Sequence, residues 1–198
     1  INPLGRLISK VKTTPLPEAD LSEKIDYLLK SVRDLDGISK TYIPSFPNLK
    51  FWFSELAIER LGKLRYLIEE VEEDDYRDFF WLCFSSIIRK VSIADPFIPP
   101  PVRLKIEKYN NSESKKRLLK EFIKQIRDPD VAGLFRKKVE ELAKKIRLLW
   151  KISEIREGKI KAYVIWDDAR EIKLGRLKEK GVLIKKESRR FPSKSIDL

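Results

Sequence analysis

Residues 51–96 read FWFSELAIERLGKLRYLIEEVEEDDYRDFFWLCFSSIIRKVSIADP, and the rest of the chain is organised around them. Apolar side chains recur at steps of three and four residues on both sides of the acidic run 72–75. This spacing places them on one face of a helix, so each half predicts an amphipathic helix. The short acidic run predicts a turn that makes the two helices antiparallel neighbours. The apolar positions are Leu56, Ile58, Leu61, Leu64, Leu67, Ile68 and Val71, then Phe79, Phe80, Cys83, Phe84, Ile87, Ile88 and Val91.

Polar residues at the ends of these helices fit the same prediction. Ser54 can cap the first helix, because its hydroxyl can accept from an unpaired backbone N–H of the first turn. Asp74 and Asp75 open the second helix, where the helix dipole favours carboxylates. Pro96 prevents helical continuation. Taken alone, this hairpin is most simply a core scaffold, since amphipathic helices usually serve packing.

The flanking segments are also mainly helical by pattern. Their expected ranges are 3–12, 20–34, 113–127 and 129–157, and a loop over 38–49 is held by Tyr42, Ile43 and Phe46. Val102 to Ile106 alternates apolar and charged residues, which favours an extended piece. The run 159–166 is β-branched and aromatic and reads as a strand, and 182–184 as a short one. The fold class is therefore mainly α with a few strands.

Several kinds of chemistry are excluded by composition. The chain holds one cysteine, Cys83, and no histidine. An internal disulfide, a Cys–His or Ser–His catalytic pair and a histidine-containing zinc site are therefore excluded, and we expect no metal. No apolar run approaches 18 residues, so we expect no membrane span and a cytoplasmic protein. Because the chain starts at Ile1 with no signal peptide and no initiating Met, we expect a piece of a longer reading frame.

Charge is distributed unevenly along the chain. The net charge is +12, made up of −2 over residues 1–100 and +14 over residues 101–198. Such a basic half suggests a polyanion as partner, with nucleic acid as the first candidate. A solvated, lysine-rich helix surface explains the same charge without a partner.

Five short stretches carry motifs in a fixed order along the chain. NPL at 2–4 with LISKVKT at 7–13 resembles the D-I-N-P-x-A-x-x-I-x-x-x-K-T stretch of the family of site-specific DNA amino-methyltransferases. FWF at 51–53 and FSSIIRKVSIAD at 84–95 resemble the helical insertion of one of its branches. VIWDDAR at 164–170 is similar to the third core strand with its G-D-A-R end, and SIDL at 195–198 to the residues before the S-P-P-Y tetrapeptide.

The resemblance implies a fold and an activity. Members methylate the exocyclic amine of adenine or cytosine in duplex DNA with S-adenosyl-L-methionine. Residues 1–14 and 158–198 would be fragments of an incomplete Rossmann-like methyltransferase core, and residues 15–157 a helical insertion for target recognition or a lid. The cofactor glycine loop would lie before Ile1 and the S-P-P-Y motif after Leu198. No catalytic residue is therefore expected within the chain, which should be inactive alone.

Some site residues follow from the same resemblance. Asp168 matches the acid that accepts a hydrogen bond from the adenine amine of the cofactor, although Asp167 stands where the family has Gly; a strand-end turn is the alternative role. Asn2 flanks the ribose-binding position, with a plain helix N-cap as the alternative. Basic and polar side chains flank the proline-rich segment after the hairpin and could contact DNA phosphates, or could simply be solvated. These are Arg89, Lys90, Ser92, Arg103 and Lys105.

Two other hypotheses stay open from the sequence. One is a non-catalytic helical nucleic-acid-binding module with Trp52, Trp81, Trp150 or Trp166 as stacking platforms, although tryptophans more often belong to a core. The other is one subunit of a split methyltransferase, completed by a second chain that supplies the missing motifs. If the chain is a binding module, its DNA binding should weaken steeply with salt. If it is one subunit of a split enzyme, a second chain should copurify with it.

Overall fold

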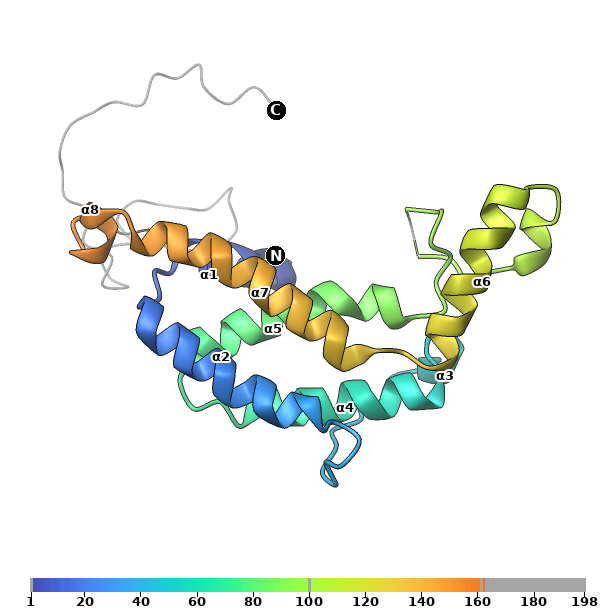
Figure 1. Cartoon of the computed structure of the whole chain (residues 1–198), viewed down its shortest axis with the longest axis horizontal. Coiled ribbons are helices and arrows are strands. Elements are labelled where there is room, and N and C mark those ends of the chain that lie inside the picture. The colour runs from blue at the N-terminus through green and yellow to red at the C-terminus, as the bar shows by residue number, and fades with distance from the viewer. Residues whose placement is uncertain (1, 100, 161, 163–198) are drawn as a thin grey trace, which may run out of the picture.

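A computed structural model describes residues 2–99, 101–160 and 162 of the chain. Long helices dominate it, as the sequence predicts (Figure 1). The α-helices are α1 Pro3–Thr13, α2 Glu18–Arg33, α3 Leu49–Trp52, α4 Glu55–Glu69, α5 Asp74–Ile88, α6 Glu113–Arg127, α7 Val131–Trp150 and α8 Ser153–Arg156, and the 3-10 helices are η1 Arg89–Val91 and η2 Ile106–Tyr109.

The core is a bundle in which α5 packs against α1, α4 and α7, and α2 packs against α4 and α7 (Figure 1). Phe79 and Phe80 of α5 are fully buried, and their rings meet edge to face with centroids 5.2 Å apart. The Phe80 ring also meets that of Phe135 on α7, 6.4 Å away. The hairpin of α4 and α5 is thus the centre of the fold, because its helices pack against α1 and α2, which precede it in the sequence, and against α7, which follows it.

Both helices of the hairpin begin where the sequence predicts, but α5 ends at Ile88 and the 3-10 helix η1 carries Val91. The Ser54 hydroxyl accepts from the backbone N–H of Ala57 at 3.3 Å, which caps α4. α5 starts at Asp74, and its first turn carries the expected carboxylates. Arg77 donates to the carbonyl oxygen of Val71 at 2.9 Å and so ties the turn between the helices to α5.

The first helix is fastened to the bundle by charge as well as by apolar contacts. The Lys10 ammonium lies 2.9 Å from an oxygen of Asp75 and 2.7 Å from one of Asp78. The Lys10 side chain is about one third exposed, so this pairing is only partly screened by solvent. Val11 is buried in the same core as α5. α1, which belongs to the segment expected to be part of the methyltransferase core, therefore contacts α5 directly.

Two secondary-structure predictions need correction. Residues 129–157 do not form one helix, because Ile152 is extended between α7 and α8. The extended piece at 102–106 is one antiparallel bridge, Arg103 to Ala94, since the 3-10 helix η2 begins at Ile106. The predicted strand at 159–166 lies mostly outside the described residues, and its first two residues form a bend. The strand at 182–184 lies wholly outside them.

Gly62 lets the loop before α3 approach α4 closely. The backbone N–H of Tyr42 donates to the Gly62 carbonyl oxygen at 3.1 Å. A Cβ on Gly62 would lie 2.3 Å from Oγ1 of Thr41 and 3.0 Å from the Tyr42 carbonyl oxygen. A close approach of this kind requires a residue without a side chain.

We therefore expect Gly62→Ala to destabilise the fold by about 1–3 kcal/mol through overpacking. Gly5→Ala is the matched control, because its Cβ would meet Cβ of Asn2 at an ordinary 3.7 Å inside α1. That control should stabilise the helix by about 0.5–1 kcal/mol. Urea unfolding of both variants measures the difference, and equal effects of the two substitutions would contradict the close approach.

Candidate nucleic-acid interface

One run of excess positive charge in the described chain lies on residues 103–127, which we call the basic arm. The arm carries nine basic and three acidic side chains, a net charge of +6. It contains η2 and α6, and α6 stands away from the helical bundle (Figure 1). Among the described residues of α6, only Leu119 is fully buried. Most of the helix surface is therefore open to a partner.

The exposed cations of α6 form a stripe. Arg117, Lys120, Lys124 and Arg127 follow one another at steps of three, four and three residues, and all four are exposed. Positions with this spacing lie on one face of a helix. A line of guanidinium and ammonium groups along one helix face suits a phosphate backbone, because such contacts need charge rather than a base-specific geometry.

The start of the arm is braced against α3 and the segment that follows α5. The Arg103 guanidinium lies over the Phe51 ring, 4.4 Å from its centroid, and donates to the Phe51 carbonyl oxygen at 2.9 Å. The Tyr109 hydroxyl donates to the buried Asp95 carboxylate at 2.7 Å. This hydrogen bond, together with burial, raises the pKa of Tyr109 to about 12. The phenol therefore stays neutral and available as a donor to Asp95 at neutral pH.

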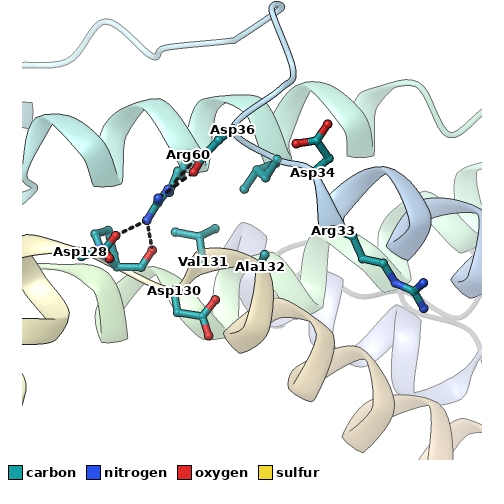
Figure 2. A pocket seen from close by; sticks show the side chains of 10 residues that line it. Arg33, Asp34, Asp36, Arg60, Asp128, Asp130, Val131 and Ala132 are labelled. Carbon is teal, nitrogen blue, oxygen red and sulfur yellow. Dashed lines mark hydrogen bonds and ion pairs between the residues drawn. The ribbon is translucent and has the colours of Figure 1, made fainter.

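The end of the arm is held by Arg60 of α4 (Figure 2). Its guanidinium donates through Nε and Nη2 to the two oxygens of Asp36, each at 2.8 Å. Nη1 donates to Asp128 at 2.6 Å and to the Pro129 carbonyl oxygen at 3.0 Å. We call Arg60 with these partners the Arg60 clamp. It joins α4 to the residues that follow α2 and to the junction between α6 and α7. A planar fork of donors suits this arrangement better than a lysine ammonium would.

We expect Arg60→Ala to destabilise the fold by about 2 kcal/mol, because the side chain is only 18% exposed and leaves several acceptors without their donor. The figure is modest because Asp36 and Asp128 are largely exposed. Lys50→Ala breaks the exposed ion pair with Glu55 and should change stability by less than about 0.5 kcal/mol. Thermal unfolding compares the two variants, and equal effects would rule out a clamp.

The pH dependence of the clamp follows from Asp36. Its hydrogen bonds with Arg60 hold the pKa of the Asp36 carboxyl below its usual value. A depressed folded-state pKa gives stability that is present above the unfolded pKa of about 3.9 and is lost as pH falls through the folded value. The stability difference between wild type and Asp36→Asn should therefore be constant above about pH 5 and shrink on acidification. A difference that grew on acidification would contradict this assignment.

The residues predicted to contact DNA have unequal surroundings. Arg89 donates to the carbonyl oxygens of Pro99 and Ile98, at 2.9 and 2.5 Å, and thus braces the proline-rich segment. Ser92 is buried, and its hydroxyl donates to the Arg89 carbonyl oxygen at 2.8 Å. Arg89, Lys90, Arg103 and Lys105 are all exposed, although Arg103 also donates to the Phe51 carbonyl oxygen. The bridge between Ala94 and Arg103 brings the two halves of this set together.

Asn2, a candidate cofactor contact, is the N-cap of α1. Its side-chain oxygen accepts from the backbone N–H groups of Leu4 and Gly5. Asp168 lies outside the described residues. Cys83 is fully buried, and burial raises the pKa of its thiol. Within residues 2–99, 101–160 and 162, no helix is long and apolar enough to cross a bilayer, and no three or more His, Cys, Asp or Glu side chains gather as metal ligands.

The stripe on α6 was not singled out from the sequence, although the basic half was. Its signal is the recurrence of cations at helical spacing between 117 and 127. The Arg60 clamp has no comparable signal. Its partners lie 24 and 68 residues away along the chain, so only the folded arrangement joins them.

Comparison with known proteins gives one informative match. Over 98 residues the chain is 39% identical to the Type II methyltransferase M.MvaI of Kocuria varians. The match covers 46% of this chain, and the chain spans only 22% of the length of that relative. No family model and no solved structure matches the chain. Nearly half of the chain is therefore related in sequence to part of a Type II methyltransferase.

Proposed function

We propose that the chain is part of an S-adenosyl-L-methionine-dependent DNA methyltransferase that modifies the exocyclic amine of adenine or cytosine in duplex DNA. The observation that carries this proposal is the 39% identity over 98 residues with M.MvaI. The motifs that resemble the family also support it, because they occur in the family's order from one end of the chain to the other. The isolated chain would be inactive, since the expected cofactor loop and S-P-P-Y motif have no counterpart in its sequence.

In this proposal residues 15–157 form the helical insertion, and residues 1–14 and 158–198 belong to the catalytic core. Lys10 supports a fixed arrangement of the two parts, because it pairs α1 with Asp75 and Asp78 of the insertion. A core that binds the cofactor would thereby be coupled mechanically to the helices that meet DNA. The insertion would serve as the target-recognition part or as a lid over the DNA.

The cofactor would supply the methyl group, and this chain would contribute to its binding. Asn2 fits a ribose contact only through its amide NH2 group, because its oxygen is used in the cap of α1. An NH2 group is a donor, and a ribose hydroxyl can accept from it. Asp168 would accept a hydrogen bond from the adenine amine.

The basic arm would hold the DNA backbone. The exposed stripe of α6 offers charge without base-reading geometry, which is the chemistry of phosphate contacts. Lys90, Arg103 and Lys105 would extend that surface along the proline-rich segment, and the buried Ser92 and the braced Arg89 would position it. Arg60 would set the angle of the arm by fixing its C-terminal end.

The DNA interface is tested by duplex binding of the 198-residue chain at graded salt. If about four cations of the arm contact phosphates, the logarithm of the affinity should fall with the logarithm of the salt concentration with a slope of about −3.6. An affinity that ignores salt would contradict the proposal. The same charge pattern also favours a non-catalytic nucleic-acid-binding module. Methyl transfer by the complete product of the reading frame separates the two, because only the enzyme labels DNA.

A further inference from the structure

A hollow of about 240 Å³ opens between the loop before α3 and the faces of α4 and α5. Its walls are mostly apolar and aromatic, and they come from segments far apart in the sequence. Tyr42 and Phe46 of the loop are 49% and 44% exposed, so they border the hollow rather than fill it. The expectation that Tyr42, Ile43 and Phe46 pin this loop is not met, because all three side chains are exposed, and the loop is attached through the backbone at Gly62. The aromatic lining is Tyr42, Phe46, Phe53, Trp81 and Phe84.

Arg65 of α4 is the only charged side chain among the described residues of this lining. Its guanidinium lies over the Tyr42 ring, 3.5 Å from the centroid, and 5.6 Å from the centroid of the Trp81 ring. Its Nε is buried and has no hydrogen-bond partner among the described residues. The ion pair with Glu69 is long, at 3.8 Å, and involves Nη2 instead. A buried donor without an acceptor calls for an explanation, and a bound ligand is one.

α3 lies between the hollow and Arg103 at the start of the basic arm. That short helix and the residue after it provide Leu49 and Phe53 to the lining and Phe51 to the contact with Arg103. Lys40, two residues before Tyr42, holds its ammonium 5.3 Å from the Tyr66 ring centroid. An anionic backbone passing the hollow would therefore find Arg103 beyond α3 and Lys40 next to the loop.

We propose that this aromatic hollow binds one unstacked base of a DNA strand held by the basic surface. The proposal rests on the proposed DNA function. Aromatic rings and guanidinium planes are the surfaces on which unpaired bases stack, and such stacking tolerates any base. Hydrogen bonding at Arg65 then adds a preference, because a guanidinium donates and cannot accept.

Thymine matches this chemistry better than adenine or cytosine does. It presents carbonyl oxygens as acceptors and a methyl group that suits an apolar wall. Adenine and cytosine each present an exocyclic amine, which is a donor and would face the donor groups of Arg65. The hollow would thus be a second base site, distinct from the catalytic site. The catalytic site must bind a base with an exocyclic amine, whereas the hollow offers hydrogen-bond donors that suit a base with carbonyl oxygens.

The test is binding of labelled oligo(dT), oligo(dC) and oligo(dA) of equal length to the 198-residue chain, followed by fluorescence anisotropy. Tyr42→Ala should weaken oligo(dT) binding about tenfold through lost stacking. Arg65→Gln should weaken it similarly and abolish the preference for oligo(dT), since glutamine adds an acceptor. The control is Tyr27→Ala, which removes a 75% exposed aromatic ring of α2 outside the hollow and should change nothing.

The outcomes separate this inference from the proposed function. If neither substitution changes oligo(dT) affinity while duplex binding keeps its salt dependence, the base site is overturned and the aromatic surface is left to a protein partner. In that case the proposed function stands. If the wild-type chain binds neither duplex nor single strands, the DNA interface of the proposed function fails first. Quenching of tryptophan fluorescence by oligo(dT), lost in Trp81→Phe, would support the base site independently.

Discussion

Replacing Arg117, Lys120 and Lys124 together by alanine is expected to weaken duplex DNA binding about a hundredfold at 0.1 M salt. All three side chains are exposed on the stripe of α6 and take no part in the core. If each contacts one phosphate, the salt slope should fall in magnitude by about 2.7. Alanine favours helix, so α6 itself should persist. Fluorescence anisotropy of a labelled duplex measures both quantities.

The matched control removes three cations from α2, by Lys24→Ala, Lys30→Ala and Arg33→Ala together. It lowers the net charge of the chain by the same amount, so it measures the general effect of charge on DNA binding. We expect a loss of less than about fivefold and a nearly unchanged slope. Equal losses in the arm and control variants would contradict a localised interface.

Phe135→Ala is expected to destabilise the fold by about 3–5 kcal/mol. The side chain is fully buried near the start of α7, and its ring meets that of Phe80 on α5. Truncation removes buried apolar area and leaves a cavity between the two helices with the most extensive mutual contact. Chemical unfolding followed by circular dichroism measures the change.

Tyr27→Ala is the control for that measurement, because it removes an aromatic ring of which 75% is exposed. Its effect should stay within about 0.5 kcal/mol. Helical content should be lost in one transition for both variants if α5 and α7 belong to one cooperative bundle. A small effect of Phe135→Ala would contradict the central position of the hairpin.

The parts of the fold that depend on local signals could be predicted from the sequence. Dense apolar repeats in α4 and α5 and the cap at Ser54 require no knowledge of distant residues. The break at Ile152 was hidden, because that residue continues the apolar period of α7 while its backbone leaves the helix. Alternation at Val102 to Ile106 indicated an extended piece, but only Arg103 finds a bridge partner.

The site was less predictable, because its geometry is made by distant contacts. Counting charges along the sequence identifies the basic half of the chain. The candidate DNA contacts near the proline-rich segment come from the resemblance to the methyltransferase family. That Ser92 is buried, and that Arg89 binds carbonyl oxygens of its own chain, depends on how the segment after α5 folds back. The aromatic hollow joins a loop, α4 and α5, and its apolar residues read simply as packing positions in the sequence.

The central claim, that this chain is part of a DNA amino-methyltransferase, is tested most directly by methyl transfer. The complete product of the reading frame that contains residues 1–198 is incubated with labelled S-adenosyl-L-methionine and duplex DNA, and the DNA is digested to nucleosides. We expect label on the exocyclic amine of adenine or cytosine, with a raised KM for DNA in the variant that replaces Arg117, Lys120 and Lys124 by alanine. Absence of label from every duplex tested, or label on a ring carbon, would contradict it.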